Sequence, residues 1–320
     1  MNIINTPILG IVVPCYNEEQ VLPHTKDRLE QLIRNLIEVE KISSDSLIVF
    51  VNDGSQDHTW ELIEKFVKEN PMFQGIKLSR NFGHQNALLA GLNTFMNSCD
   101  CIISIDSDLQ DDIQVIEEMV DKFREGFDIV YGVRKERKSD TFFKRTTALV
   151  FYKLMKWLGV EIIYNHSDYR MASRRVLENL NSFNEVNLFL RGIFPLIGYP
   201  STCVYYDRLE RFAGESKYPL KKMMAFAFDG ISSFSIKPLR IVSIIGIIVF
   251  FMSIIMAIYS LYSHLFLGTV PGWTSITLPV YFISGIQILC IGVIGEYLGK
   301  VYKEVKSRPR YIIEKILFKK

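Results

Sequence analysis

The chain has 320 residues and a formal net charge of +2, so it lacks the basic excess typical of nucleic-acid-binding proteins, and we predict no nucleic-acid partner. Hydrophobic residues make up 48% of the sequence, and the five cysteines are scattered without the paired spacing of a metal site, which predicts reduced thiols. The apolar residues are unevenly distributed: up to about residue 235 the composition is that of a soluble α/β protein, whereas two long apolar runs follow Leu239.

Short apolar runs alternate with amphipathic stretches through the N-terminal part of the chain. We predict strands at residues 8–13, 47–51, 75–78, 101–105 and 128–131. Helices are predicted at residues 18–39, 60–68, 86–96 and 113–124. This alternation predicts an α/β fold with a mostly parallel sheet covered by helices on both faces.

Polar residues follow the predicted strands. In sheets of this kind, ligands bind beyond the carboxyl ends of the strands. The residues at these positions are Tyr16, Asn17, Glu18, Asp53, Arg80, Asp106, Asp108 and Arg134. We therefore predict an active site at this edge of the sheet.

Two carboxylates stand one residue apart after the fourth predicted strand, at Asp106 and Asp108. Both can reach a hard divalent cation and leave coordination positions for substrate phosphates, and Gln110 can add a neutral oxygen. An acidic turn before a helix is also common, and Asp111 or Asp112 can act as a helix cap instead. The spacing alone leaves a metal site and a capped turn both open.

Two further polar turns, at residues 14–19 and 51–55, close the first two predicted strands. Asp53 can accept hydrogen bonds from a base or a ribose, and Gly54 permits a tight turn. Three polar turns at one sheet edge suit a nucleoside, its ribose and a metal-bound diphosphate.

Two apolar runs near the C-terminus predict membrane-spanning helices at about residues 241–262 and 276–296. Each is long enough for a bilayer core about 30 Å thick, which needs ~20 residues. A pair of buried core helices is the alternative. The connection at 264–275 has no Lys or Arg, whereas basic residues flank both outer ends, so the positive-inside rule places the preceding domain and both termini in the cytoplasm.

Four motifs resemble, in order, the signature of family 2 inverting glycosyltransferases. They are Pro14-x-Tyr16-Asn17-Glu18-Glu19, Asn52-Asp53-Gly54-Ser55-x-Asp57, Leu78-Ser79-Arg80-Asn81-Phe82-Gly83 and Asp106-Ser107-Asp108-Leu109-Gln110. More narrowly, the chain resembles the polyisoprenyl-phosphate glycosyltransferases, which include dolichol-phosphate mannose synthases and bactoprenol glucosyltransferases. The chain departs from the family pattern in two places: Asp112-Ile113 stands where Pro-Pro is frequent, and Asn52 where Asp is frequent.

The resemblance implies a GT-A-like, Rossmann-type domain that binds a nucleotide-sugar. The residues implied for the donor nucleotide-sugar are Pro14, Tyr16, Glu18, Asp53 and Asp106. Mg²⁺ or Mn²⁺ would be held against the diphosphate by Asp106, Asp108 and Gln110, which makes Asp108 essential to catalysis.

The resemblance also implies an acceptor site. Its phosphate ligands would be Arg134, Arg145, Arg211 and Lys217. A solvated basic loop is the alternative for residues 134–138. Asp168 resembles the family's catalytic acidic residue. Because a phosphate monoester has a second pKa near 6 and needs little help to ionise, Asp168 is either a general base or an arginine-positioning residue.

The expected organisation is a cytoplasmic glycosyltransferase domain at 1–213, an interfacial amphipathic segment at 214–236, a transmembrane hairpin at 237–300 and a cytoplasmic basic tail at 301–320. The segment would lie against membrane lipid. Glycines in the second run permit close packing, and hence a homo-oligomer. Two spans are too few for a flippase, so we expect a separate flippase to carry the product.

The expected reaction is an inverting, metal-dependent transfer of a monosaccharide, with glucose from UDP-glucose as first choice, to undecaprenyl or another polyisoprenyl phosphate at the cytoplasmic face of the inner membrane. Two alternatives stay open. One is a processive polysaccharide synthase, although the Gln-x-x-Arg-Trp signature of that class is absent. The other is a non-catalytic membrane scaffold that retained the fold.

Overall fold

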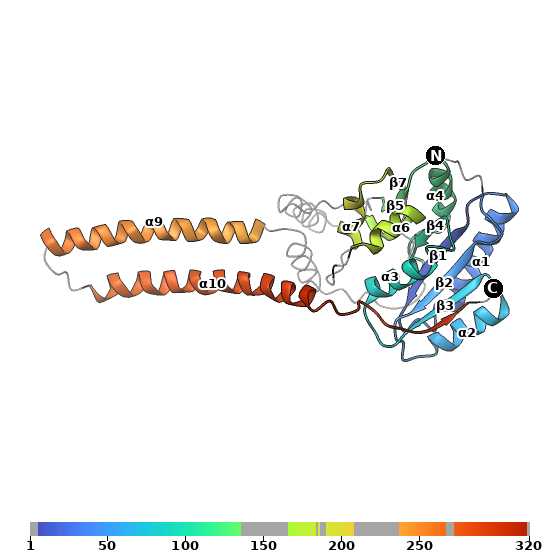
Figure 1. The fold of residues 1–320 in the computed structure, drawn as a ribbon, viewed down its shortest axis with the longest axis horizontal. Coiled ribbons are helices and arrows are strands. Elements are labelled where there is room, and N and C mark those ends of the chain that lie inside the picture. The colour runs from blue at the N-terminus through green and yellow to red at the C-terminus, as the bar shows by residue number, and fades with distance from the viewer. Residues whose placement is uncertain are drawn as a thin grey trace. The chain divides into compact units, whose positions relative to one another are not determined.

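The computed structural model describes residues 6–135, 166–183, 185, 190–207, 237–266 and 272–318. The predicted interfacial segment at 214–236 and the predicted acceptor ligands Arg145, Arg211 and Lys217 lie outside these residues. The chain divides into two compact units, and Figure 1 labels most of their elements. One unit contains the α/β fold together with residues 308–320, and the other contains two long helices.

The predicted strand–helix alternation is present in the first unit, with ends shifted by a few residues. Its elements are β1 (Leu9–Cys15), α1 (Leu22–Glu38), β2 (Leu47–Asn52), α2 (Thr59–Glu69), β3 (Phe73–Leu78), α3 (His84–Phe95), β4 (Cys101–Ser104), α4 (Val115–Arg124) and β5 (Ile129–Arg134). Helix α1 begins later than predicted because Pro23 fits its first turn, and the preceding residues form a turn beside β2.

The sheet has the strand order β7-β5-β6-β4-β1-β2-β3-β8. Strand β1 is parallel to β2 and β4, β2 to β3, and β5 to β7 (Ser201–Tyr206), so the mostly parallel sheet is confirmed. Strand β6 (His166–Ser173) is antiparallel to both β4 and β5, and β8 (Ile313–Leu317) is antiparallel to β3. Neither antiparallel strand is predicted from the sequence.

Helices cover both faces of the sheet. Helices α1, α2 and α4 share one apolar core with alternate residues of the strands, including the ring cluster of Phe50, Phe66 and Phe73. On the other face, α3 contacts β1, β2 and β3, and α6 (Arg174–Asn181) contacts α3 and α7 (Leu190–Ile197). The carboxyl ends of β1, β2 and β4 are thereby held at one edge.

Strand β8 closes the sheet edge at β3, as the red strand beside β3 in Figure 1 shows. Leu317 packs against the core, Ser79 donates its N–H to the carbonyl of Ile312 at 3.0 Å, and Lys315 pairs with Glu64 at 2.8 Å. The predicted basic tail therefore contains a strand of the α/β unit.

A chain ending at Tyr311 is expected to lose about 2 kcal/mol or more of stability, because it leaves the β3 edge unpaired and exposes apolar surface under Leu317. Thermal unfolding in detergent would measure the loss. The control is Glu314→Ala, which removes only the ion pair with Lys77 and should cost less than about 1 kcal/mol. Equal melting temperatures for the shortened and full chains would show that β8 does not stabilise the sheet.

The second unit contains α9 (Lys237–Phe266) and α10 (Trp273–Val305), which contact each other. Among the described residues, one segment is long and apolar enough to cross a bilayer, Phe282–Val305 in α10, and the apolar segment Leu239–Val249 in α9 is shorter. The predicted span at 276–296 overlaps the former, whereas the predicted span at 241–262 is not confirmed.

Candidate active site

The turns after β1 and β2 are hydrogen-bonded to each other. The backbone N–H of Asn17 donates to Oγ of Ser55 at 3.0 Å, and the N–H of Glu18 donates to Oγ1 of Thr59 at 2.9 Å. The ring of Tyr16 remains 44% exposed at the same edge. An exposed aromatic ring on a fixed turn is suited to stacking on a base.

Asp53 anchors the loop after β3. Its Oδ1 accepts the N–H of Phe82 at 2.7 Å and its Oδ2 accepts the N–H of Gly83 at 2.9 Å. Burial raises the pKa of the Asp53 carboxyl, and the two N–H donors oppose that rise. The structure thus shows a loop-anchoring role, and the predicted contact of Asp53 with the nucleoside stays a prediction.

Gly54 lies against the same loop. It has φ of 67°, and a Cβ there would lie 2.4 Å from the carbonyl carbon of Arg80 and 2.5 Å from the nitrogen of Asn81. Backbone atoms cannot move aside as a flexible side chain can.

Gly54→Ala is therefore expected to cost more than the about 1–2 kcal/mol of a left-handed residue alone and to weaken nucleotide binding. The matched control is Gly126→Ala, at φ of 103° with no atom within 4 Å of the added carbon. Thermal unfolding and calorimetric titration with UDP would measure both effects. Equal stability losses in the two variants would contradict a role for this close approach.

The loop after β4 presents the predicted metal ligands. Asp108 is half-exposed, and its Oδ1 accepts the N–H of Gln110 at 3.2 Å. Desolvation and the neighbouring carboxylates of Asp168, Asp111 and Asp108 raise the pKa of Asp106, and His84 opposes them. A cation would relieve this concentration of negative charge, so the donor chemistry fits Mg²⁺ or Mn²⁺.

The protein supplies only part of such a coordination shell. Within the described residues, no group of three or more His, Cys, Asp or Glu side chains is arranged to hold a metal. A cation bound through one or two carboxylates would take its other ligands from phosphates and water, as Mg²⁺ commonly does in proteins.

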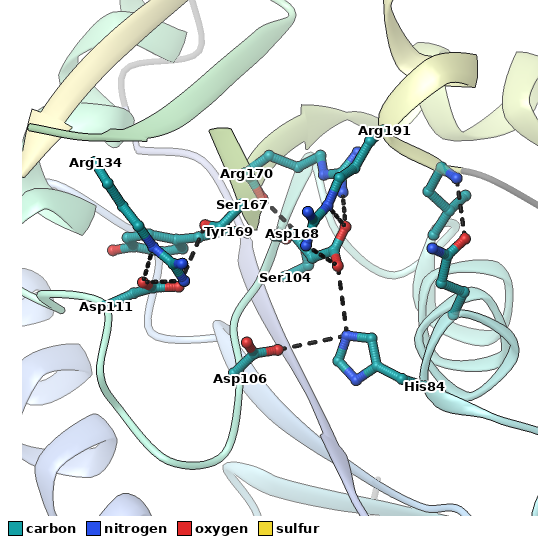
Figure 2. A network of polar contacts seen from close by, with 12 residues as sticks. His84, Ser104, Asp106, Asp111, Arg134, Ser167, Asp168, Tyr169, Arg170 and Arg191 are labelled. Carbon is teal, nitrogen blue, oxygen red and sulfur yellow. Dashed lines mark hydrogen bonds and ion pairs between the residues drawn. The ribbon is translucent and has the colours of Figure 1, made fainter. Parts of the chain in front are cut away.

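His84 connects β6 to the loop after β4, which carries the predicted metal ligands (Figure 2). It begins α3, and its Nε2 lies 3.4 Å from Oδ1 of Asp106 and 3.8 Å from Oδ2 of Asp168. Ser104 pairs with Arg170, so the register two residues further on places Asp106 level with Asp168. The antiparallel strand β6 thus brings Asp168 to the edge where the loop after β4 begins.

Asp168 is a buried carboxylate held by two arginines (Figure 2). Arg191 donates from Nε to Oδ1 at 3.2 Å and from Nη2 to Oδ2 at 3.0 Å, and Arg170 also donates to Oδ1. Although burial favours the neutral acid, Arg191 and Arg170 hold the pKa of Asp168 well below its ordinary value. Asp168 is therefore ionised, with both oxygens already accepting hydrogen bonds.

A second arginine–carboxylate pair lies at the end of β5. Nε and Nη2 of Arg134 donate to Oδ1 of buried Asp111 at 3.1 and 2.9 Å. Asp111 therefore does not cap α4, whereas Asp112 accepts the N–H of Gln114 at 3.0 Å just before that helix.

The predicted residues are distributed as follows. Most of them lie in the turns at the carboxyl ends of β1, β2 and β4, at the end of β5, or in the adjoining part of β6. These residues are Tyr16, Glu18, Asp53, Asp106, Asp108, Gln110, Arg134 and Asp168. Pro14 is buried inside β1, opposite Val51. Sequence reasoning missed His84, Arg191 and Tyr206, and it considered Asp111 only as a helix cap. Only His84 had a signal, because it directly follows the motif that ends at Gly83.

Comparisons with known proteins follow the same division of the chain. Residues 10–180 match the model of the family described as Glycosyl transferase family 2, and residues 237–301 match the GtrB C-terminal hairpin. The uncharacterized glycosyltransferase YkoT of Bacillus subtilis is 52% identical over 96% of this chain and 91% of its own. The SfII prophage-derived bactoprenol glucosyl transferase of Shigella flexneri is 39% identical over 96% of this chain and 97% of its own. Among solved structures, the mannosyltransferase PcManGT of Pyrobaculum calidifontis is 13% identical, and the match covers 95% of this chain and 88% of that one. The TM-score is 0.46, a similarity too low to support a functional conclusion.

Proposed function

Because this chain belongs to glycosyl transferase family 2 and is a glycosyltransferase, we propose that it transfers glucose from UDP-glucose to undecaprenyl phosphate with inversion at the anomeric carbon. The observation that carries the proposal is the meeting of the Asp106 loop with Asp168, Arg170 and Arg191 at one sheet edge. The relatives named bactoprenol glucosyl transferase, similar over nearly the whole chain, support the choice of sugar and lipid.

The donor would bind across the ends of β1, β2 and β4. Tyr16 would stack on the uracil, and Asp53 would fix the neighbouring loop. Asp106, Asp108 and Gln110 would hold Mg²⁺ or Mn²⁺, whose charge would stabilise the leaving diphosphate. His84 would keep Asp106 oriented.

The acceptor phosphate would be the nucleophile. Its second pKa is about 6, so at neutral pH it is largely a dianion and carries no proton that a base must remove. A phosphate oxygen would form the new bond to the anomeric carbon while the bond to UDP breaks and its electrons pass to the diphosphate. Since Asp168 accepts hydrogen bonds from Arg170 and Arg191, it would hold these guanidinium groups in place rather than act as a base.

The match to the GtrB hairpin and the apolar segment Phe282–Val305 support a membrane anchor of two spans, α9 and α10. Lys306 lies 4.2 Å from the ring of Tyr302, a pairing typical of residues at a membrane interface. The positive-inside rule would place both helix ends and the catalytic unit in the cytoplasm. In this proposal a separate flippase would carry the product, and a homo-oligomer stays a prediction.

The test uses the purified full chain in detergent with undecaprenyl phosphate, Mg²⁺ and a panel of radiolabelled nucleotide-sugars. We expect label from UDP-glucose in the organic phase, dependent on lipid and abolished by EDTA, and a β-linked product by NMR. Transfer from another donor would correct the sugar. Hydrolysis of a nucleotide-sugar without lipid labelling would overturn the acceptor.

A further inference from the structure

A buried polar cluster surrounds the base of Arg134. Oη of Tyr206 donates to Oδ1 of Asp111 at 2.6 Å and accepts from Nε of Arg134 at 3.2 Å. Oγ of Ser167 lies 3.3 Å from Oδ2 of Asp111 and 3.1 Å from the Tyr206 oxygen. The members come from the β4–α4 loop, β5, β6 and β7, and Figure 2 shows Arg134, Asp111 and Ser167 converging.

This cluster differs from a surface ion pair. The side chain of Asp111 is 2% exposed, and Tyr206 and Ser167 are equally buried, so the geometry is fixed by packing on several sides. Tyr206 also packs edge-on against Tyr169, with ring centroids 5.4 Å apart. A buried carboxylate is stable only when it is paired and hydrogen-bonded, and Arg134 and Tyr206 meet that need here.

The cluster also fixes which part of Arg134 remains available. Within the described residues, its hydrogen bonds use Nε and Nη2, so these partners leave the N–H groups of Nη1 unengaged. The side chain is 28% exposed at the last residue of β5. A guanidinium held along one edge can still offer its remaining donors to a phosphate oxygen.

We propose that Asp111 and Tyr206 are positioning residues that hold the Arg134 guanidinium ready for the acceptor phosphate. Asp111 follows the predicted metal ligands in the same loop, so the cluster also sets the acceptor arginine relative to the donor's diphosphate. This inference rests on the proposed transfer to a lipid phosphate and on the expectation from the sequence that Arg134 binds that phosphate.

Tyr206→Phe tests the proposal, because it removes the hydroxyl and keeps the ring that packs on Tyr169. The matched control is Tyr205→Phe, at the neighbouring position of β7, where the side chain is 58% exposed. We expect the KM for undecaprenyl phosphate to rise about five- to tenfold in Tyr206→Phe, with kcat and the KM for UDP-glucose within about twofold. Tyr205→Phe should change none of these values.

A double variant separates positioning from general loosening. Arg134→Lys replaces the planar guanidinium group with an ammonium group, a point charge that Tyr206 cannot orient. If Tyr206 acts through Arg134, the lipid KM of Arg134→Lys with Tyr206→Phe should equal that of Arg134→Lys alone within about twofold.

Three outcomes would overturn the inference. The first is a lipid KM in the double variant that equals the product of the two single effects. The second is an unchanged lipid KM in Tyr206→Phe. The third is a rise of both KM values together with a fall in kcat and in melting temperature. If the unaltered protein labels no lipid, the proposed function fails and this inference with it. Lipid labelling without a selective effect of Tyr206→Phe overturns the inference alone.

Discussion

Asp108→Asn is expected to lower kcat/KM for sugar transfer by about 10³-fold or more, while the protein stays folded. A metal-bound charge at the leaving group contributes several kcal/mol of transition-state stabilisation, and each 1.4 kcal/mol is about tenfold in rate. The half-exposed Asp108 loses a negative charge but keeps its shape as asparagine. Initial rates with UDP-glucose and undecaprenyl phosphate, measured across a Mg²⁺ series, would give the loss and any change in metal requirement.

Asp112→Asn is the matched control, because it makes the same chemical change in the same loop. Asp112 accepts the N–H of Gln114, and an asparagine oxygen can do so equally well. Its activity should stay within about twofold of the unaltered protein. Near-normal, metal-dependent transfer by Asp108→Asn would rule out Asp108 as a metal ligand.

Asp168→Asn is expected to reduce both stability and activity. It leaves the buried Arg170 without its carboxylate, and breaking a buried pair from one side costs about 3–5 kcal/mol. For a unit of this size that loss lowers the melting temperature by roughly 10 °C. Asp121→Asn is the control, since Asp121 pairs with Lys41 at the surface and its loss should cost less than about 1 kcal/mol.

The pH dependence distinguishes a positioning residue from a general base. The pKa of Asp168 is lowered in the folded protein, so its contribution to stability is present above its unfolded pKa of about 3.9 and is lost only as pH falls through the lower folded pKa. Titration of Asp168 itself should therefore add no pH-dependent change to the stability difference between the protein and Asp168→Asn from pH 5 to 8. The acid limb of kcat/KM near pH 6, which we assign to the acceptor phosphate, should persist in the residual activity of Asp168→Asn. A limb that disappears in the variant would instead identify Asp168 as the base.

The first five strands and four helices could be predicted because the strands are short apolar runs and the helices are amphipathic. Strand β6 could not, because its sequence, His166 to Ser173, is largely polar although every residue is buried. Its charges are compensated by distant partners, such as Arg191 for Asp168, which no local pattern reveals. Strand β8 could not be predicted either, because its five residues, Ile313 to Leu317, have two adjacent charged residues and no alternation of apolar and polar side chains.

The candidate site was predictable to the same extent. The turns after β1, β2 and β4 carry motifs, so Tyr16, Asp53 and Asp106 could be placed at one edge from the sequence. The role of Asp111 could not be predicted, because an acidic residue just before a helix can either cap that helix or pair with an arginine, as Asp111 does with Arg134. Arg191 and Tyr206 stand in apolar stretches without a motif, and only the fold brings them to Asp168 and Asp111.

The mass of the lipid product tests the central claim most directly. The full chain would be incubated with UDP-glucose, undecaprenyl phosphate and Mg²⁺, and the organic phase analysed by mass spectrometry, with Asp108→Asn run in parallel. We expect a single new species, undecaprenyl phosphate plus one hexose, which is absent from the variant. A ladder of several hexoses would indicate a processive synthase, and no new lipid species in the presence of UDP-glucose turnover would contradict transfer to the lipid.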